Sequence, residues 1–151
     1  MPEKLDGIGH CAMAAMARFY QDVLGFRLLE EDPDHGGIFL NLAGTSHTID
    51  LFPMGTGRTK PAKDGSPLMN IAFKVSSYRA LREAHDTLIE HGAGIQALRD
   101  HVSQRSIYFS DPEGTPLEIN YEKPNWAEFF ENGRGDDDGA FSFDAPAPGR
   151  E

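Results

Sequence analysis

Cysteine, basic charge and long apolar runs are all scarce in this chain of 151 residues. A single cysteine, Cys11, excludes an internal disulfide and fits a reducing compartment, so we expect a cytoplasmic protein. The 14 basic residues are outnumbered by 24 acidic ones, and the net charge of −10 argues against nucleic acid or an anionic membrane surface as a partner. No apolar run approaches the roughly 18 residues of a membrane helix. The charged opening residues also predict no signal peptide.

The hydrophobic share of 39% is enough for a globular domain with a core. We expect this domain over residues 1–122, followed by an acidic, Gly- and Pro-rich C-terminal tail over residues 123–151. The composition of the tail is typical of a segment that cannot build its own core. Its aromatic residues, among them Trp126 and Phe143, would nevertheless allow the tail to be anchored to the body or to a partner chain.

One order of predicted elements occurs twice along the body. Each half shows the pattern of a strand, a helix and three further strands, with modules at residues 5–55 and 66–122. The strands are expected at residues 5–14, 26–32, 37–44, 47–54, 69–75, 94–100, 106–111 and 116–122. The helices are expected at 15–24 and 77–91, with Ser77 as the N-cap of the second one. We therefore predict an α+β fold of two tandem βαβββ modules, whose strands form a cupped mixed β-sheet with the helices on its outer face.

Superposing the two modules aligns four polar residues on corresponding strands. His10 falls on Asn70 in the first strand of each module, and Asp50 falls on Glu118 in the last strand. Asp50 and Glu118 each lie between two apolar residues, so they face the opposite side of the sheet from those neighbours. If the helices cover the apolar side, all four residues point together into the concave side as potential ligands. The alternative for Glu118 or Asp50 is an exposed strand position.

The chain resembles the vicinal oxygen chelate superfamily, which includes glyoxalases, fosfomycin and bleomycin resistance proteins and extradiol ring-cleaving dioxygenases. The segments that carry this resemblance are GIGHCAMA, RFYQDVLGFRLLEED, HTIDLF, NIAFKV and DHVSQRSIYFSDPEGTPLE. The resemblance implies a divalent metal ion bound by His10, by the residue at the position of Asn70 and by Glu118. In glyoxalase-like members a carboxylate at the position of Asp50 is a further ligand.

Residues 100–114 are most similar to the extradiol dioxygenase branch. The resemblance implies that His101 acts as acid and base near the metal and that Tyr108 hydrogen-bonds the substrate. The first prediction is therefore a dioxygenase that uses Fe(II) on a small catechol-like substrate. Such sites need two imidazoles and one carboxylate on the iron. This chain departs from that pattern, because Asn70 stands where the second imidazole is expected.

Two alternatives stay open at this point. A glyoxalase-type lyase or isomerase would use His10, Asp50 and Glu118 to bind Ni(II), Mn(II), Co(II) or Zn(II). A binding protein of the bleomycin-resistance type would have no chemistry and would take a small cationic drug in an acidic groove, which the net charge suits. In either case we expect a small-molecule partner and a homodimer, because βαβββ modules can pair within one chain or across a dimer.

Overall fold

The computed structural model describes residues 13–42, 44, 48–53, 70–131 and 138–145. The chain divides into two compact units. Unit 1 comprises Met1–Pro67 with Asp111–Glu113, and unit 2 comprises Leu68–Ser110 with Gly114–Glu151.

Unit 1 contains a helix and a small antiparallel sheet. Residues 13–18 are helical and continue into a π-helical turn, η2 (Phe19–Val23), which ends before Gly25 at a φ of +74°. The predicted strand over residues 5–14 lies outside the described residues except for 13 and 14, which belong to the helix. The sheet has the order β1 (Arg27–Glu31), β2 (Ile38–Asn41), β3 (Ile49–Leu51), and the sequence predicts each of these three strands.

Tyr20 is the centre of the core of unit 1. Its ring packs edge-on against the buried Phe26, and its hydroxyl donates a 3.0 Å hydrogen bond to Asp111. Burial raises the pKa of the Tyr20 hydroxyl far above its usual range, and the charge of Asp111 acts in the same direction. The phenol therefore stays protonated and keeps donating to this carboxylate.

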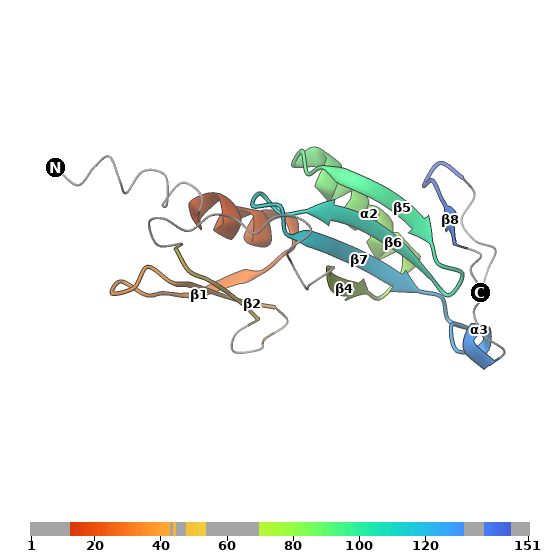
Figure 1. The fold of residues 1–151 in the computed structure, drawn as a ribbon, viewed down its shortest axis with the longest axis horizontal. Helices are drawn as coiled ribbons and strands as arrows, with labels where there is room; N and C mark the ends of the chain where they lie inside the picture. Colours follow the sequence, from red (N-terminus) through yellow and green to blue (C-terminus); the bar gives the residue numbers. More distant parts are fainter. Residues whose placement is uncertain (1–12, 43, 45–47, 54–69, 132–137, 146–151) are drawn as a thin grey trace. The chain divides into compact units, whose positions relative to one another are not determined.

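Unit 2 has the βαβββ order that the sequence predicts. Its elements are β4 (Ile71–Val75), α2 (Tyr78–Glu90), β5 (Ile95–Asp100), β6 (Gln104–Ser110) and β7 (Pro116–Glu122). The sheet has the order β4-β7-β6-β5-β8, with β4 parallel to β7 and the other neighbours antiparallel (Figure 1). The predicted cap is also confirmed, because Ser77 accepts a hydrogen bond from the Ala80 amide at the start of α2.

The register of the sheet separates an apolar face from a polar face. On one face the pairs Phe109↔Leu117 and Ile107↔Ile119 are buried. Helix α2 packs on the sheet with two fully buried leucines, Leu81 and Leu88, so this is the face under the helix. The opposite face carries the alternate residues of the same strands. Its polar side chains are described in the next subsection.

The C-terminal tail extends the sheet of unit 2. A short helix, α3 (Glu128–Glu131), follows β7, and β8 (Gly139–Ala140) pairs antiparallel with β5 (Figure 1). Phe143 is only 7% exposed and packs against Tyr78 and His85 of α2. The prediction that tail aromatics anchor the tail to the body is confirmed for Phe143. We call residues 138–145 the docked tail.

Candidate functional site

The polar face of the unit 2 sheet is built by simple alternation along three strands. Cross-strand pairs Tyr108↔Glu118 and Ser106↔Asn120 place four polar residues next to one another on β6 and β7. Strand β4 adds the pair Ala72↔Glu118, so a small residue stands beside this carboxylate. The sequence predicts that Glu118 faces away from its apolar neighbours, and the register confirms that orientation.

Glu118 is the most enclosed acidic residue of this face, with 6% of its surface exposed. Its carboxylate accepts hydrogen bonds from Ser106 Oγ at 2.6 Å and from Gln104 Nε2 at 3.2 Å on one oxygen. Asn70 Nδ2 donates to the other oxygen at 2.6 Å. Because a buried carboxylate without partners is costly, these three neutral donors make the position tolerable. The alternative of a solvent-facing glutamate is therefore excluded.

Two asparagine amides stand beside Glu118. Asn70 comes from the residue before β4 and meets Glu118 across 48 positions of sequence, as the superposed modules predict for residues facing one site. Asn120 follows Glu118 by two positions, is 8% exposed, and its side-chain oxygen has no hydrogen-bond partner among the described residues. A buried acceptor in this state can accept a hydrogen bond from a water molecule or a ligand.

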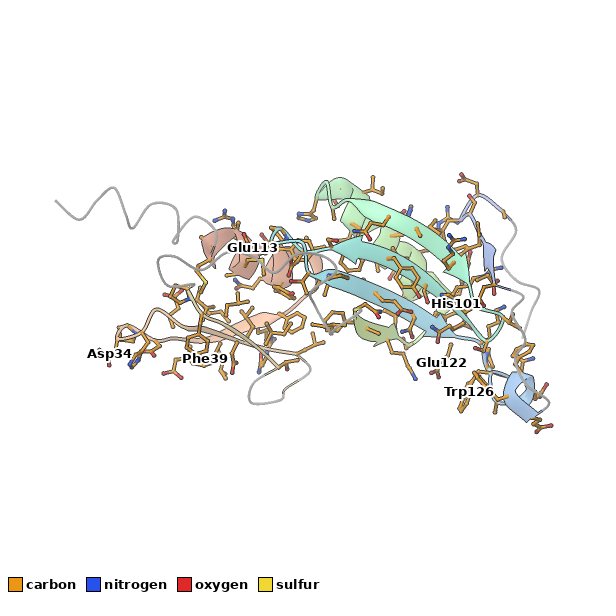
Figure 2. The ribbon with its side chains drawn as sticks, viewed as in Figure 1. Asp34, Phe39, His101, Glu113, Glu122 and Trp126 are labelled. Carbon is orange, nitrogen blue, oxygen red and sulfur yellow. The ribbon has the colours of Figure 1, made fainter. Side chains whose placement is uncertain are left out.

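An imidazole and a second carboxylate continue from Tyr108. His101 Nε2 lies 2.8 Å from the Tyr108 hydroxyl, and His101 Nδ1 lies 2.7 Å from Asp138 Oδ2 in the docked tail. The His101 and Tyr108 rings meet edge-on at 5.9 Å between centroids. His101 and Tyr108, to which the resemblance assigns roles in one site, are in contact. Figure 2 labels His101 beyond the end of β5.

The Tyr108 hydroxyl is held in its protonated form. Burial raises the pKa of Tyr108, and the negative charge of Glu118 and a hydrogen bond to it act in the same direction. The hydrogen bond with Ser106 acts in the opposite direction without reversing the shift. Tyr108 therefore keeps its proton, and both His101 and Glu118 lie next to its hydroxyl.

A tight turn fixes the backbone of His101 between β5 and β6. Val102 has a φ of +67°, a conformation that β-branched residues rarely adopt. The Asp100 carboxylate stabilises the turn by accepting a 3.0 Å hydrogen bond from the Val102 amide. The His101 amide itself donates to Gln104 O at 2.8 Å. Strain of this kind persists only where surrounding contacts determine the conformation, and it concentrates at functional positions.

Asp100 also binds two cations under the docked tail. Its carboxylate accepts hydrogen bonds from Arg105 Nε at 2.9 Å and Lys123 Nζ at 3.0 Å. The Arg105 guanidinium lies over the rings of Tyr78 and Phe141, at 5.3 and 5.0 Å from their centroids. Desolvation opposes ionisation of Asp100, but the two cations outweigh it and lower its pKa. This cluster therefore stabilises the turn and the tail.

The remaining predicted ligands lie elsewhere. His10 and Cys11 fall outside the described residues. Asp50 lies in β3 of unit 1, exposed between two half-buried neighbours, Ile49 and Leu51. Its alternation is as predicted, and its role as a ligand stays a prediction.

The donors around Glu118 can be compared with what a divalent metal ion requires. Among the residues that the structure describes, no group of three or more His, Cys, Asp or Glu side chains gathers in one place. The polar face supplies the Glu118 carboxylate, toward which Asn70 and Gln104 turn their amide nitrogens, and the Asn120 side-chain oxygen, so a hard or borderline divalent cation would need further ligands from elsewhere. It does not fit the two-imidazole set of Fe(II) dioxygenases, because position 70 is an asparagine.

Some residues of the site were not predicted from the sequence. Gln104 and Ser106 share the alternation of Tyr108 along β6, and Asn120 shares that of Glu118, so a period-two pattern was the available signal. Asp138 carried no such signal, because it belongs to a run of acidic residues in a segment without periodicity.

The family profile that matches residues 7–119 describes the glyoxalase/bleomycin resistance protein/dioxygenase superfamily. The chain belongs to this superfamily. YaeR of Escherichia coli strain K12 is 30% identical over 115 residues, which cover 70% of this chain and 84% of YaeR. Members of the superfamily generally use a divalent metal, bind small molecules and commonly form dimers.

Solved structures of the superfamily share the fold of this chain. A glyoxylase/bleomycin resistance protein/dioxygenase domain from Frankia sp. EAN1pec has a TM-score of 0.64 at 20% identity, covering 74% of this chain and 84% of that one. The fosfomycin resistance protein FosX from Listeria monocytogenes has a TM-score of 0.59 at 19% identity, covering 75% and 86%. At the described positions, no helix is long and apolar enough to cross a membrane.

Proposed function

We propose that this protein is a metal-dependent enzyme that transfers a proton on a small substrate with two adjacent oxygen atoms. The observation that supports this best is the direct sequence of contacts from the buried Glu118 through Tyr108 to His101. A carboxylate ligand beside an acid–base pair is what such chemistry needs. In this proposal Glu118 is a metal ligand, His101 accepts or returns the proton, and Tyr108 orients the substrate.

A lyase or isomerase of the glyoxalase type is the first candidate, because it needs no second imidazole at position 70. His10 and Asp50 are the further ligands that this proposal assigns, with Asn70 as a hydrogen-bond partner of Glu118. When bound, a divalent cation such as Ni(II), Mn(II), Co(II) or Zn(II) would act as a Lewis acid on a substrate oxygen. The Asn120 amide oxygen, which has no partner on the described residues, is available to accept from a substrate hydroxyl.

An extradiol dioxygenase acting on a catechol is the second candidate. The contact between His101 and Tyr108 favours it, because the resemblance assigns acid–base and substrate roles to these two residues. Asn70 argues against it, because an amide is a weak ligand for Fe(II) where an imidazole is expected. Preference for Fe(II) over the other cations separates the two candidates.

The proposed function also includes an oligomeric state, a location and a class of substrate. We expect a homodimer, as is common in this superfamily, and a cytoplasmic location, as the single cysteine suggests. The natural substrate should carry two vicinal oxygen atoms, since a divalent cation can bind both of them while the neighbouring acid–base pair moves a proton.

Metal titration with two matched variants tests this proposal. Metal-stripped protein is titrated anaerobically with Fe(II), Ni(II), Mn(II) and Zn(II), in the native form and as Glu118→Gln and Glu122→Gln. Glu122 ends the same strand but pairs with Lys74 at 2.6 Å, so it controls for the loss of one negative charge. We expect stoichiometric binding by the native protein and by Glu122→Gln. Glu118→Gln should weaken it by more than about tenfold, since even outer-shell partners of metal ligands have effects of that size.

Equal binding by the native protein and Glu118→Gln would refute both enzyme candidates. It would leave the third possibility, a binding protein of the bleomycin-resistance type. A titration with a small cationic drug would then be the relevant measurement.

A further inference from the structure

Asp138 belongs to the docked tail, yet it meets His101 across 37 positions of sequence. The distance between Asp138 Oδ2 and His101 Nδ1 is 2.7 Å, which is short for a hydrogen bond between nitrogen and oxygen. The other ring nitrogen of His101 lies 2.8 Å from the Tyr108 hydroxyl. Both nitrogens of this imidazole therefore have a defined partner, and each partner comes from a different part of unit 2.

The chemistry of the two partners determines where the proton of the neutral ring resides. An ionised carboxylate can only accept hydrogen bonds, so His101 Nδ1 must carry the hydrogen that faces Asp138. Nε2 then has a free lone pair and accepts from the Tyr108 hydroxyl. Removing the carboxylate removes this requirement on Nδ1, so the Nε2–H form becomes accessible.

We propose that Asp138 is a positioning residue that holds His101 as the Nδ1–H tautomer, so that Nε2 faces Tyr108 as a base. This inference rests on the proposed function and deepens it. His101 can take the proton of the Tyr108 hydroxyl only while Nε2 is unprotonated. The tail thus supplies a part of the acid–base group that the sheet alone lacks.

The proton transfer balances with these residues. Tyr108 gives its hydroxyl proton to His101 Nε2 while its oxygen receives one proton from the substrate. The net change is one proton moved from substrate to imidazole, with the phenol regenerated. The resulting imidazolium carries a hydrogen on each nitrogen, and its positive charge lies against the Asp138 carboxylate. The return of the proton follows the same contacts in reverse.

Two features of the fold keep Asp138 in place. Gly139, directly after it, begins β8 and pairs with Asp100, the residue directly before His101. Phe143 anchors the other end of the docked tail against α2. On the other side of the contact, the His101 amide donates to Gln104 O in the turn at Val102. Both partners of the hydrogen bond therefore sit on backbone that is itself held by the sheet.

Nitrogen chemical shifts of the histidine rings in ¹⁵N-labelled protein test the inference at a pH where His101 is neutral. The native protein should show His101 as the Nδ1–H tautomer. Asp138→Ala should shift it measurably toward Nε2–H. Asp144→Ala is the matched control in the same tail, because Asp144 bonds only to the nearby Ser142 in the described contacts, and it should leave the tautomer unchanged. Protection of the Phe141 amide from exchange, which bonds to Leu98 O, reports whether the tail stays docked in each variant.

An unchanged tautomer in Asp138→Ala would overturn the inference, and so would an equal shift in Asp144→Ala. A shift in Asp138→Ala with the tail still docked would support it. The tautomer is read without substrate or metal, so its outcome is independent of the metal titration. If the titration fails but the tautomer is as expected, the proposed enzyme function is refuted. The role of Asp138 in holding the His101 tautomer then still stands.

Discussion

Replacing Phe143 with alanine should release the docked tail without unfolding the rest of unit 2. The Phe143 ring is almost fully buried, and its centroid lies 4.7 Å from that of His85 and 5.7 Å from that of Tyr78, both on α2, and 5.0 Å from that of Phe141 in the tail itself. Its two partners on α2 are seven positions apart, which places them on one face of that helix. Phe143 therefore anchors the docked tail to α2.

The size of the effect follows from burial. Removing a buried phenylalanine ring costs about 3–5 kcal/mol. The lower end applies to a terminal segment, because the tail can undock instead of leaving a cavity. About 3 kcal/mol corresponds to a rise of roughly 100-fold in the undocked population, since 1.4 kcal/mol is a factor of ten. The sheet itself keeps its buried pairs between β6 and β7.

Native-state hydrogen exchange measures this change. The Phe141 amide should exchange about 100-fold faster in Phe143→Ala, while amides of the core residue Ile107 should keep their protection. Phe130→Ala is the control, because Phe130 is 52% exposed in the same tail and should change neither amide. Two results would refute the reasoning. One is an unchanged Phe141 amide. The other is equal acceleration of Phe141 and Ile107, which would make the tail inseparable from the core.

Two further predictions concern buried polar contacts. Tyr20→Phe should lower the free energy of unfolding by about 1–3 kcal/mol, because Asp111 loses a buried donor; denaturant titration measures this, and an unchanged midpoint would contradict it. The folded-state pKa of Asp100 is lowered from its usual 3.8, so its contribution to stability is present above about pH 4 and lost as the pH falls through the folded value. Asp100→Asn should therefore flatten the decline of stability below pH 4, and identical slopes in both proteins would count against the cluster with Arg105 and Lys123.

Patterns of short range determined most of the architecture. The αβββ portion of the second module and the Ser77 cap follow from local spacing, and the structure has them where the sequence predicts. Alternation along β7 also predicted that Glu118 faces away from Leu117 and Ile119. These features were predictable because side-chain direction in a strand or helix depends on a few neighbouring residues. The repeat of the modules further predicted that Asn70 and Glu118 face one site.

Tertiary structure alone decided which partners complete the site. The approach of Asp138 to His101 depends on the docking of a tail whose sequence has no periodicity, and the contact between Tyr20 and Asp111 spans 91 positions. Contacts of this kind arise from packing between segments that meet only after the chain has folded, so no local pattern encodes them. The sequence thus determined which faces of the strands are polar. The folded chain determined that a carboxylate from the tail lies against His101.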